Sequence, residues 1–373
     1  MTRTALIGAA IVTPEGVREG SSLVLDEDRI AAIVVGCADA DEVVDLGGGM
    51  LLPGFIDTQV NGGGGVLFND TPTVNGIVAI AEAHRRFGTT GLLPTLISDD
   101  LAVVERAMDA VDDAIDAGVP GVRGIHIEGP FLNPGKRGIH DASKFRTLDA
   151  AAIALLTRPS RGVRLVTLAP ELVPPGAIEA LTAGCVIVAA GHSMADYAQT
   201  RAALDAGLAG FTHLFNAMTG LGSREPGMVG AAMEDRASHF GLIVDSHHVA
   251  PATLRIALAA RGLDGAMLVT DAMPPAGTDM TEFMLMGRRI IVADGVLRGE
   301  DGTLAGAPLT MDQAWRNAID LLGLDVAQAS RLASTNPARF LGLQTGAIVP
   351  GLRADLVHLD ADRRVTRSWI AGA

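Results

Sequence analysis

The chain has 373 residues and a formal net charge of −14, with 43 acidic against 29 basic side chains. This acidic excess argues against binding to nucleic acid or to a membrane surface, because both need a basic face on the protein. Apolar residues make up 48% of the sequence and aromatic residues only 3%, so we expect an aliphatic core packed around many of the 45 glycines.

The first 52 residues predict a β-rich segment, because β-branched runs such as LIGAAIVT and DEVVDLGG alternate with turn residues. The short apolar run at the N-terminus is broken by TPEG at residues 13–16, so we interpret it as a strand and not as a signal peptide. Cys37 and Cys185 lie in apolar runs without the spacing of a disulfide framework or a zinc site. We expect two buried, reduced thiols in a cytoplasmic protein.

From residue 53 onward, apolar strands alternate with amphipathic helices, expected at residues 74–87, 101–117, 194–206 and 251–261. Eight such strands predict an α/β protein with a (β/α)8 TIM barrel, in which near-continuous apolar strands are covered by helices. The expected strands are residues 54–59, 89–95, 122–127, 164–169, 185–190, 209–212, 240–245 and 266–270.

An insertion follows the eighth strand. Residues 284–297 place an Asp294-Gly295 turn between apolar runs, which predicts a β-hairpin. Helices are expected at residues 311–322 and 326–334, and the tail then returns to β character. We therefore expect a small β-sandwich domain formed by residues 1–52 and 341–373, with a metal-dependent barrel domain at residues 53–340 between them.

Ionisable residues gather where the barrel strands end, which is where active sites form in this fold. Glu128 follows the third strand and Asp271 the eighth, and packing alone does not explain so many titratable groups there. Six of the nine histidines lie at or near these ends: His126, His140, His192, His213, His247 and His248.

One carboxylate and two neutral imidazoles, with a fourth position left open, form the ligand set of a catalytic zinc site. We assign these ligands to Glu128, His192 and His213. A metal held there would polarise a substrate carbonyl and activate a water molecule. Asp271 is then the natural group to take the proton of that water and return it to a leaving group.

Loop donors near the same strand ends form a candidate phosphate or sugar site. The NAMTG loop from Asn216 offers backbone and side-chain amides, and Arg224 and His248 add donors that can carry charge. Taken alone, these residues are also compatible with ordinary loop structure. The glycine run at residues 62–65 lacks the pattern of a nucleotide-binding loop, so we interpret it as a turn.

Seven motifs resemble the amidohydrolase superfamily and, within it, the N-acetylglucosamine-6-phosphate deacetylases. HIEGPF with GKRGIH, and HLFNAM, are quite specific for the deacetylases, whereas the C-terminal GAIVPGLRADLVHLD is typical of the wider superfamily. The matching motifs are PGFIDTQVNGGGG (53–65), HIEGPFLNPGKRGIH (126–140), GHS (191–193), THLFNAM (212–218), DSHHV (245–249), TDAM (270–273) and LAGA (304–307).

The resemblance implies metal-dependent hydrolysis of N-acetyl-D-glucosamine 6-phosphate to D-glucosamine 6-phosphate and acetate, in amino-sugar catabolism and cell-wall sugar recycling. Asp271 matches the acid/base residue, and His140 matches a residue that orients the acetyl carbonyl. A phosphate ligand shared between subunits implies a homodimer, and the adjacent His247 and His248 leave open which of them contacts the substrate. The implied substrate-binding residues are His140, Asn216, Ala217, Arg224, His248, Ala305, Gly306 and Ala307.

The chain departs from the superfamily pattern at the end of the first strand. Many members carry His-x-His there for a second metal, but this chain has Gln59 and Asn61, and neutral amides are poor zinc ligands. We expect one tightly held divalent metal, Zn²⁺, with Gln59 and Asn61 marking a candidate weak second site. Alternatives are another amidohydrolase acting on a related N-acetyl amino sugar, or a non-catalytic barrel, which would lack the metal ligands retained here.

Overall fold

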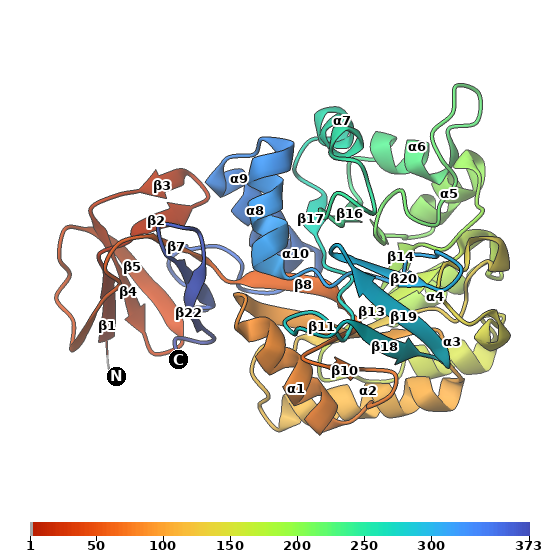
Figure 1. Ribbon diagram of the computed structural model, residues 1–373, viewed down its shortest axis with the longest axis horizontal. Helices are drawn as coiled ribbons and strands as arrows, with labels where there is room; N and C mark the ends of the chain where they lie inside the picture. Colours follow the sequence, from red (N-terminus) through yellow and green to blue (C-terminus); the bar gives the residue numbers. More distant parts are fainter. Residues whose placement is uncertain (1–2) are drawn as a thin grey trace.

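The computed structural model describes residues 3–373, in which a parallel barrel stands beside a smaller two-sheet β unit (Figure 1). The barrel strands pair in chain order, and a parallel bridge between Val60 and Ala272 joins the first strand to the segment after the last. The predicted (β/α)8 barrel is therefore confirmed. Its strands are β8 Phe55–Val60, β11 Thr89–Ile97, β12 Gly124–Glu128, β13 Val163–Leu168, β14 Val186–Ala190, β15 Gly210–Phe211, β16 His239–Leu242 and β17 Ala266–Leu268.

Helices cover the outside of the barrel because each presents an apolar stripe to the strands. In α2, for example, Val104, Met108 and Val111 are buried at helical spacing. The helices are α1 Val74–Arg85, α2 Leu101–Asp116, α3 Ala150–Leu156, α4 Ala177–Ala183, α5 Tyr197–Asp205, α6 Gly227–Glu234, α7 Pro251–Arg261, α8 Met311–Leu322, α9 Val326–Ser330 and α10 Asn336–Phe340. Short 3-10 turns span Pro134–Lys136, Ala142–Lys144 and Pro170–Leu172, and a π-helical turn spans Arg331–Thr335.

The N- and C-terminal segments form two sheets that share one core, as a β-sandwich requires. One sheet has the order β5-β4-β1-β6 and the other β22-β21-β7-β2-β3, so the tail pairs with the N-terminal strands. Leu6, Leu23, Leu51 and Trp369 from both sheets pack in the core between them. The strands are β1 Arg3–Ile7, β2 Ala10–Thr13, β3 Gly16–Arg18, β4 Ser21–Asp26, β5 Arg29–Val35, β6 Glu42–Asp45, β7 Met50–Pro53, β21 Leu356–Leu359 and β22 Val365–Trp369.

The insertion after β17 forms a three-stranded antiparallel sheet that packs on the mouth of the barrel. Phe283, Leu285 and Ile290 of this sheet share an apolar cluster with Ile139 and Met273. The expected turn at residues 294–295 joins its last two strands. These strands are β18 Glu282–Leu285, β19 Arg288–Ala293 and β20 Val296–Gly299, and the glycine run after β8 forms the short hairpin β9 Gly62–Gly63 and β10 Val66–Leu67.

Three expectations about local structure need correction. Cys37 and Cys185 are exposed, so the prediction of buried thiols was wrong; Cys185 lies in a turn before β14, with φ +60°. The helix expected from residue 194 begins at Tyr197, because the Asp196 side chain caps it. The helix expected to end at residue 334 ends at Ser330 and continues as a π-helical turn. No helix within residues 3–373 is both long and apolar enough to cross a membrane.

Candidate metal centre and substrate pocket

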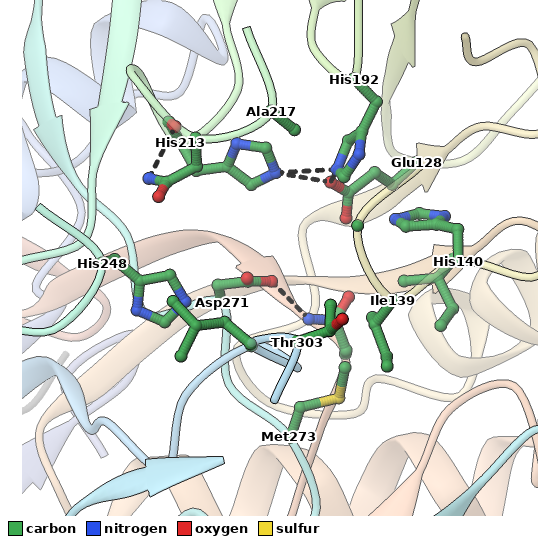
Figure 2. Close-up of a pocket in the computed structure, with 16 residues that line it drawn as sticks. Glu128, Ile139, His140, His192, His213, Ala217, His248, Asp271, Met273 and Thr303 are labelled. Carbon is green, nitrogen blue, oxygen red and sulfur yellow. Dashed lines mark hydrogen bonds and ion pairs between the residues drawn. The ribbon is translucent and has the colours of Figure 1, made fainter. Parts of the chain in front are cut away.

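A cavity of about 250 Å³ lies at the carboxyl ends of the barrel strands (Figure 2). It brings together most of the residues that the sequence predicted for the site. Those lining it are Asn61, Glu128, His140, His192, His213, Asn216, Ala217, His248, Asp271 and Gly306. Six further lining residues had not been predicted: Ile97, Gly138, Ile139, Met273, Thr303 and Leu304.

The three predicted metal ligands converge on one point. Glu128 ends β12, while His192 and His213 follow β14 and β15 in left-handed backbone conformations, with φ +49° and +31°. Nε2 of His192 lies 3.1 Å from Oε1 of Glu128, and Nε2 of His213 lies 3.0 Å from the same oxygen. The two Nε2 atoms are themselves 3.0 Å apart. Figure 2 shows both imidazoles directed at the Glu128 carboxylate.

A backbone carbonyl behind the His192 ring determines which ring nitrogen faces this point. Nδ1 of His192 lies 2.8 Å from the carbonyl oxygen of Lys136, which can only accept a hydrogen bond. The Nδ1–H therefore donates to that carbonyl, and Nε2 of the neutral ring presents a lone pair. Ring nitrogens held in this way are characteristic of metal-binding histidines. A carboxylate oxygen and two imidazole nitrogens gathered so closely fit a divalent metal ion.

The protonation of Glu128 also suits a ligand. Burial opposes its ionisation, but the adjacent imidazoles of His192 and His213 outweigh burial and hold the pKa of Glu128 well below its usual range. Burial likewise lowers the pKa of His213, but the hydrogen bond to Glu128 and its charge reverse this, so the pKa of His213 is raised. The ionised carboxylate, which this shift favours, is the form that binds a metal.

Asp271 faces the three ligands from the other side of the cavity and is held by two amides. Its Oδ1 accepts hydrogen bonds from Nε2 of Gln59 at 3.0 Å and from Nδ2 of Asn61 at 2.7 Å. Nε2 of Gln59 also donates to Oε2 of Glu128 at 3.2 Å. Burial raises the pKa of Asp271, as does the charge of Glu128, while His213, His248 and Asn61 oppose that rise. The second carboxylate oxygen, Oδ2, accepts no hydrogen bond from residues 3–373.

His140 is the third imidazole beside Glu128. Ligand atoms of Glu128, His140 and His192 lie within 4.8 Å of one another, so position alone makes His140 a further candidate ligand. Its Nδ1 is engaged elsewhere, 2.8 Å from Oγ of Ser98. Burial lowers the pKa of His140 to about 3, with His192 contributing in the same direction, so the ring is neutral. The sequence had singled out His140 but offered no signal for Ser98.

The predicted sugar and phosphate residues separate into two groups. Asn216, Ala217 and His248 line the cavity, and Nδ1 of His248 lies 2.6 Å from Oδ2 of Asp245. His247 lies outside the cavity lining and is exposed, which distinguishes the two adjacent histidines by position. Arg224 is exposed in the loop before α6 and does not line the cavity of its own chain.

Two residues of the LAGA motif lie behind the cavity. Ala305 and Ala307 are buried, and the backbone N–H of Ala307 donates to the carbonyl oxygen of Asp271 at 2.9 Å. Only Gly306 of the three predicted residues reaches the lining. His126 lies inside the barrel, where it pairs with the Thr58 carbonyl and the Thr167 hydroxyl, so it is a structural residue below the site.

Residues 50–373 match the amidohydrolase family. A relative from Shewanella sp. (strain ANA-3), named N-acetylgalactosamine-6-phosphate deacetylase, is 47% identical over 88% of this chain and 83% of its own length. The N-acetylglucosamine-6-phosphate deacetylase of Bos taurus is 36% identical over 98% of this chain and 89% of its own. The crystal structure of N-acetylglucosamine-6-phosphate deacetylase from Pasteurella multocida has a TM-score of 0.95 at 32% identity, covering 99% of this chain and 98% of that one.

Proposed function

The chain belongs to the amidohydrolase family, and from that membership we propose that it deacetylates an N-acetylhexosamine 6-phosphate, releasing acetate and the free amino sugar phosphate. The observation that carries this proposal is the convergence of Glu128, His192 and His213 on one point that faces Asp271. N-acetyl-D-glucosamine 6-phosphate is the first candidate substrate. The reaction belongs to cytoplasmic amino-sugar catabolism.

A second candidate substrate is N-acetyl-D-galactosamine 6-phosphate. The relative at 47% identity carries that name, whereas the bovine N-acetylglucosamine-6-phosphate deacetylase is 36% identical. The two sugars differ only in the orientation of the hydroxyl at C4. The acetamide and the phosphate would therefore contact the same residues, and the choice between the two epimers depends on the remaining wall of the cavity.

Glu128, His192 and His213 would hold one divalent metal, which we propose to be Zn²⁺, because a carboxylate and two imidazoles suit that ion. When bound there, the ion polarises the acetamide carbonyl and activates the attacking water. The amide nitrogens of Gln59 and Asn61 donate to Asp271, so these side chains turn N–H groups toward the site. That orientation opposes a second metal at the candidate weak site.

Asp271 acts as the acid and base in this proposal. Its Oδ2 takes a proton from the attacking water and then delivers it to the departing amine, so the amine leaves neutral. The raised pKa of Asp271 suits a group that must both accept and return a proton. His140 donates a hydrogen bond to the acetyl oxygen as negative charge develops on it. Asn216, Ala217 and His248 bind the phosphate end.

We further propose that Arg224 binds the phosphate held by a neighbouring subunit in a homodimer. The support is its position on an exposed loop, outside the cavity of its own chain, beside Leu221, which is 65% exposed. Co-expression of Arg224→Ala with Asp271→Asn subunits tests this, because a mixed dimer then contains one complete site. We expect the mixture to recover activity that neither variant has alone. Without recovery, Arg224 does not act across a subunit interface.

The test of the function is acetate release measured on both 6-phosphates and on both unphosphorylated sugars, with metal content determined on the same sample. We expect a kcat/KM for one 6-phosphate that exceeds the values for both unphosphorylated sugars, at about one metal per chain. A fully metal-loaded protein that releases no acetate from any of the four sugars would refute the proposal.

A further inference from the structure

Ser98, directly after β11, contacts the ring of His140 on the edge that carries Nδ1. We infer that Ser98 is a positioning residue that fixes the proton of His140 on Nε2. The ring then presents a hydrogen-bond donor to the acetyl oxygen and is kept from binding the metal. The inference rests on the proposed function for the identity of the acceptor, but the proton position is a property of the protein alone.

Two groups of one residue, its backbone N–H and its hydroxyl, contact the same nitrogen. The backbone nitrogen of Ser98 lies 3.3 Å from Nδ1 of His140, and its Oγ lies 2.8 Å from that atom. The hydroxyl could donate or accept, but a backbone N–H can only donate. Nδ1 must therefore present a lone pair, and in the neutral imidazole the proton then resides on Nε2.

The site is built so that Ser98 can take this position. Ser98 is 1% exposed, and its Oγ also lies 3.5 Å from the carbonyl oxygen of Glu128. A Cβ at Gly129, the residue after Glu128, would lie 2.3 Å from Oγ of Ser98, so only glycine leaves room for the hydroxyl. Gly129 also has φ +88°, which disfavours any side chain there. The glycine that follows β12 and the serine that follows β11 are thus parts of one arrangement.

His192 is oriented in the opposite way, and this contrast shows what Ser98 decides. The ring centroids of His140 and His192 are only 4.5 Å apart, and both residues flank Glu128 (Figure 2). The Lys136 carbonyl requires a proton on Nδ1 of His192, which leaves Nε2 free to bind a metal. The Ser98 amide requires the reverse for His140, whose protonated Nε2 cannot ligate. The backbone group behind each ring therefore determines its role: the carbonyl behind His192 makes that ring a metal ligand, and the amide behind His140 makes that ring a hydrogen-bond donor.

A neutral N–H donor suits the chemistry of the acetyl oxygen. Charge develops on that oxygen in the transition state, and a fixed donor that is already in place stabilises the charge without reorganisation. A ring free to change tautomer would turn a lone pair toward the same oxygen in part of the molecules. Ser98→Ala removes the shorter contact to Nδ1, that of the hydroxyl at 2.8 Å, and leaves only the backbone N–H at 3.3 Å to hold the ring. We therefore expect a lower kcat, while substrate binding, which depends on the phosphate end, stays close to normal.

The decisive measurement is neutron diffraction from crystals of the zinc-loaded protein grown in deuterated buffer. We expect deuterium on Nε2 of His140 and none on Nδ1, with the reverse at His192. Deuterium on Nδ1 of His140, or its Nε2 within bonding distance of the metal, would overturn the inference. Neither result depends on which sugar is the substrate, so a failure of the proposed function remains distinguishable.

Kinetics of Ser98→Ala provide the second measurement, with Ser334→Ala as a matched control. Ser334 is also fully buried and donates one hydrogen bond, to the carbonyl oxygen of Pro53. For Ser98→Ala we expect roughly a 10-fold lower kcat, which is the effect of losing one hydrogen bond in the transition state. The KM should stay within about 2-fold of the parent value, and the metal content should not change. Ser334→Ala should keep its kcat. Equal kcat values for the two variants, or metal loss in Ser98→Ala, would contradict a positioning role.

Discussion

The cavity has two sides that use similar side chains differently. On the metal side, defined by Glu128, His192 and His213, a carboxylate oxygen and two Nε2 atoms lie within 3.1 Å of one another. On the proton side, defined by Asp271 and His140, the polar atoms are met by N–H donors from Asn61, Gln59 and Ser98. The metal side brings carboxylate and imidazole atoms to one point, whereas on the proton side N–H donors already pair Oδ1 of Asp271 and Nδ1 of His140.

The difference teaches that the groups behind a side chain, and not its type, determine its chemistry at this site. Histidine occurs on both sides: the Lys136 carbonyl stands behind His192, and the Ser98 amide stands behind His140. Asp271 accepts hydrogen bonds from two neutral amides, which fix one carboxylate oxygen but leave the negative charge of the group unneutralised. The contrast between the two sides supports a site with one metal and a separate base beside it. Four predictions test the contrast between the two sides.

The largest effect is expected for His213→Ala, which removes one of three groups that meet on the metal side. Metal content measured by elemental analysis after dialysis should fall well below one per chain. Activity should fall on the order of 10⁴-fold, because a Lewis acid contributes several kcal/mol to the transition state. Full metal occupancy in this variant would remove His213 from the ligand set.

Asp271→Asn tests the proton side without touching the metal side. The amide is nearly the same size but cannot take a proton, so kcat should fall roughly 10²- to 10⁴-fold. Metal content and thermal stability should stay close to those of the parent, since Asp271 contributes no ligand atom in this arrangement. Near-normal turnover would show that another group is the base.

Gly138→Ala tests how firmly the metal side depends on its surroundings. Gly138 has φ +55°, and a Cβ there would lie 3.3 Å from Cε1 of His192. The added methyl group should displace that ring from the Lys136 carbonyl and weaken metal affinity about 10-fold, as changes around a ligand commonly do. Competition with a chelator measures this affinity, and an unchanged affinity would mean that the loop adapts.

The smallest effect is expected for Asn61→Ala and is best measured as a pH profile. The Asn61 amide stabilises ionised Asp271 and so lowers its pKa; removing the amide should raise that pKa. Because the base must be ionised, the acid limb of the kcat profile should move to higher pH. At pH values above this limb, kcat should fall only a few-fold, which is the effect expected from the loss of one hydrogen bond. An acid limb that stays in place would mean that Asn61 does not act through Asp271.

The sequence alone was sufficient for the barrel and for the metal side. Strands buried on both faces need continuous apolar runs, and these runs can be counted in the sequence; each observed barrel strand overlaps a predicted one. Parallel strands in a closed barrel present all their carboxyl ends on one face. The residues that follow the strands, Glu128, His192, His213 and Asp271, therefore had to approach one another once the fold was known.

Only the tertiary structure decided how those residues are prepared. Ser98 lies 42 positions from His140, and the Lys136 carbonyl lies 56 positions from His192, so no local pattern connects either pair. The insertion that supplies Thr303 and Leu304 reaches the cavity by packing on the barrel mouth, which hydrophobic periodicity does not reveal. Residue types and their order are local properties of the chain, whereas the proton position on an imidazole depends on a distant backbone group that folding places behind it.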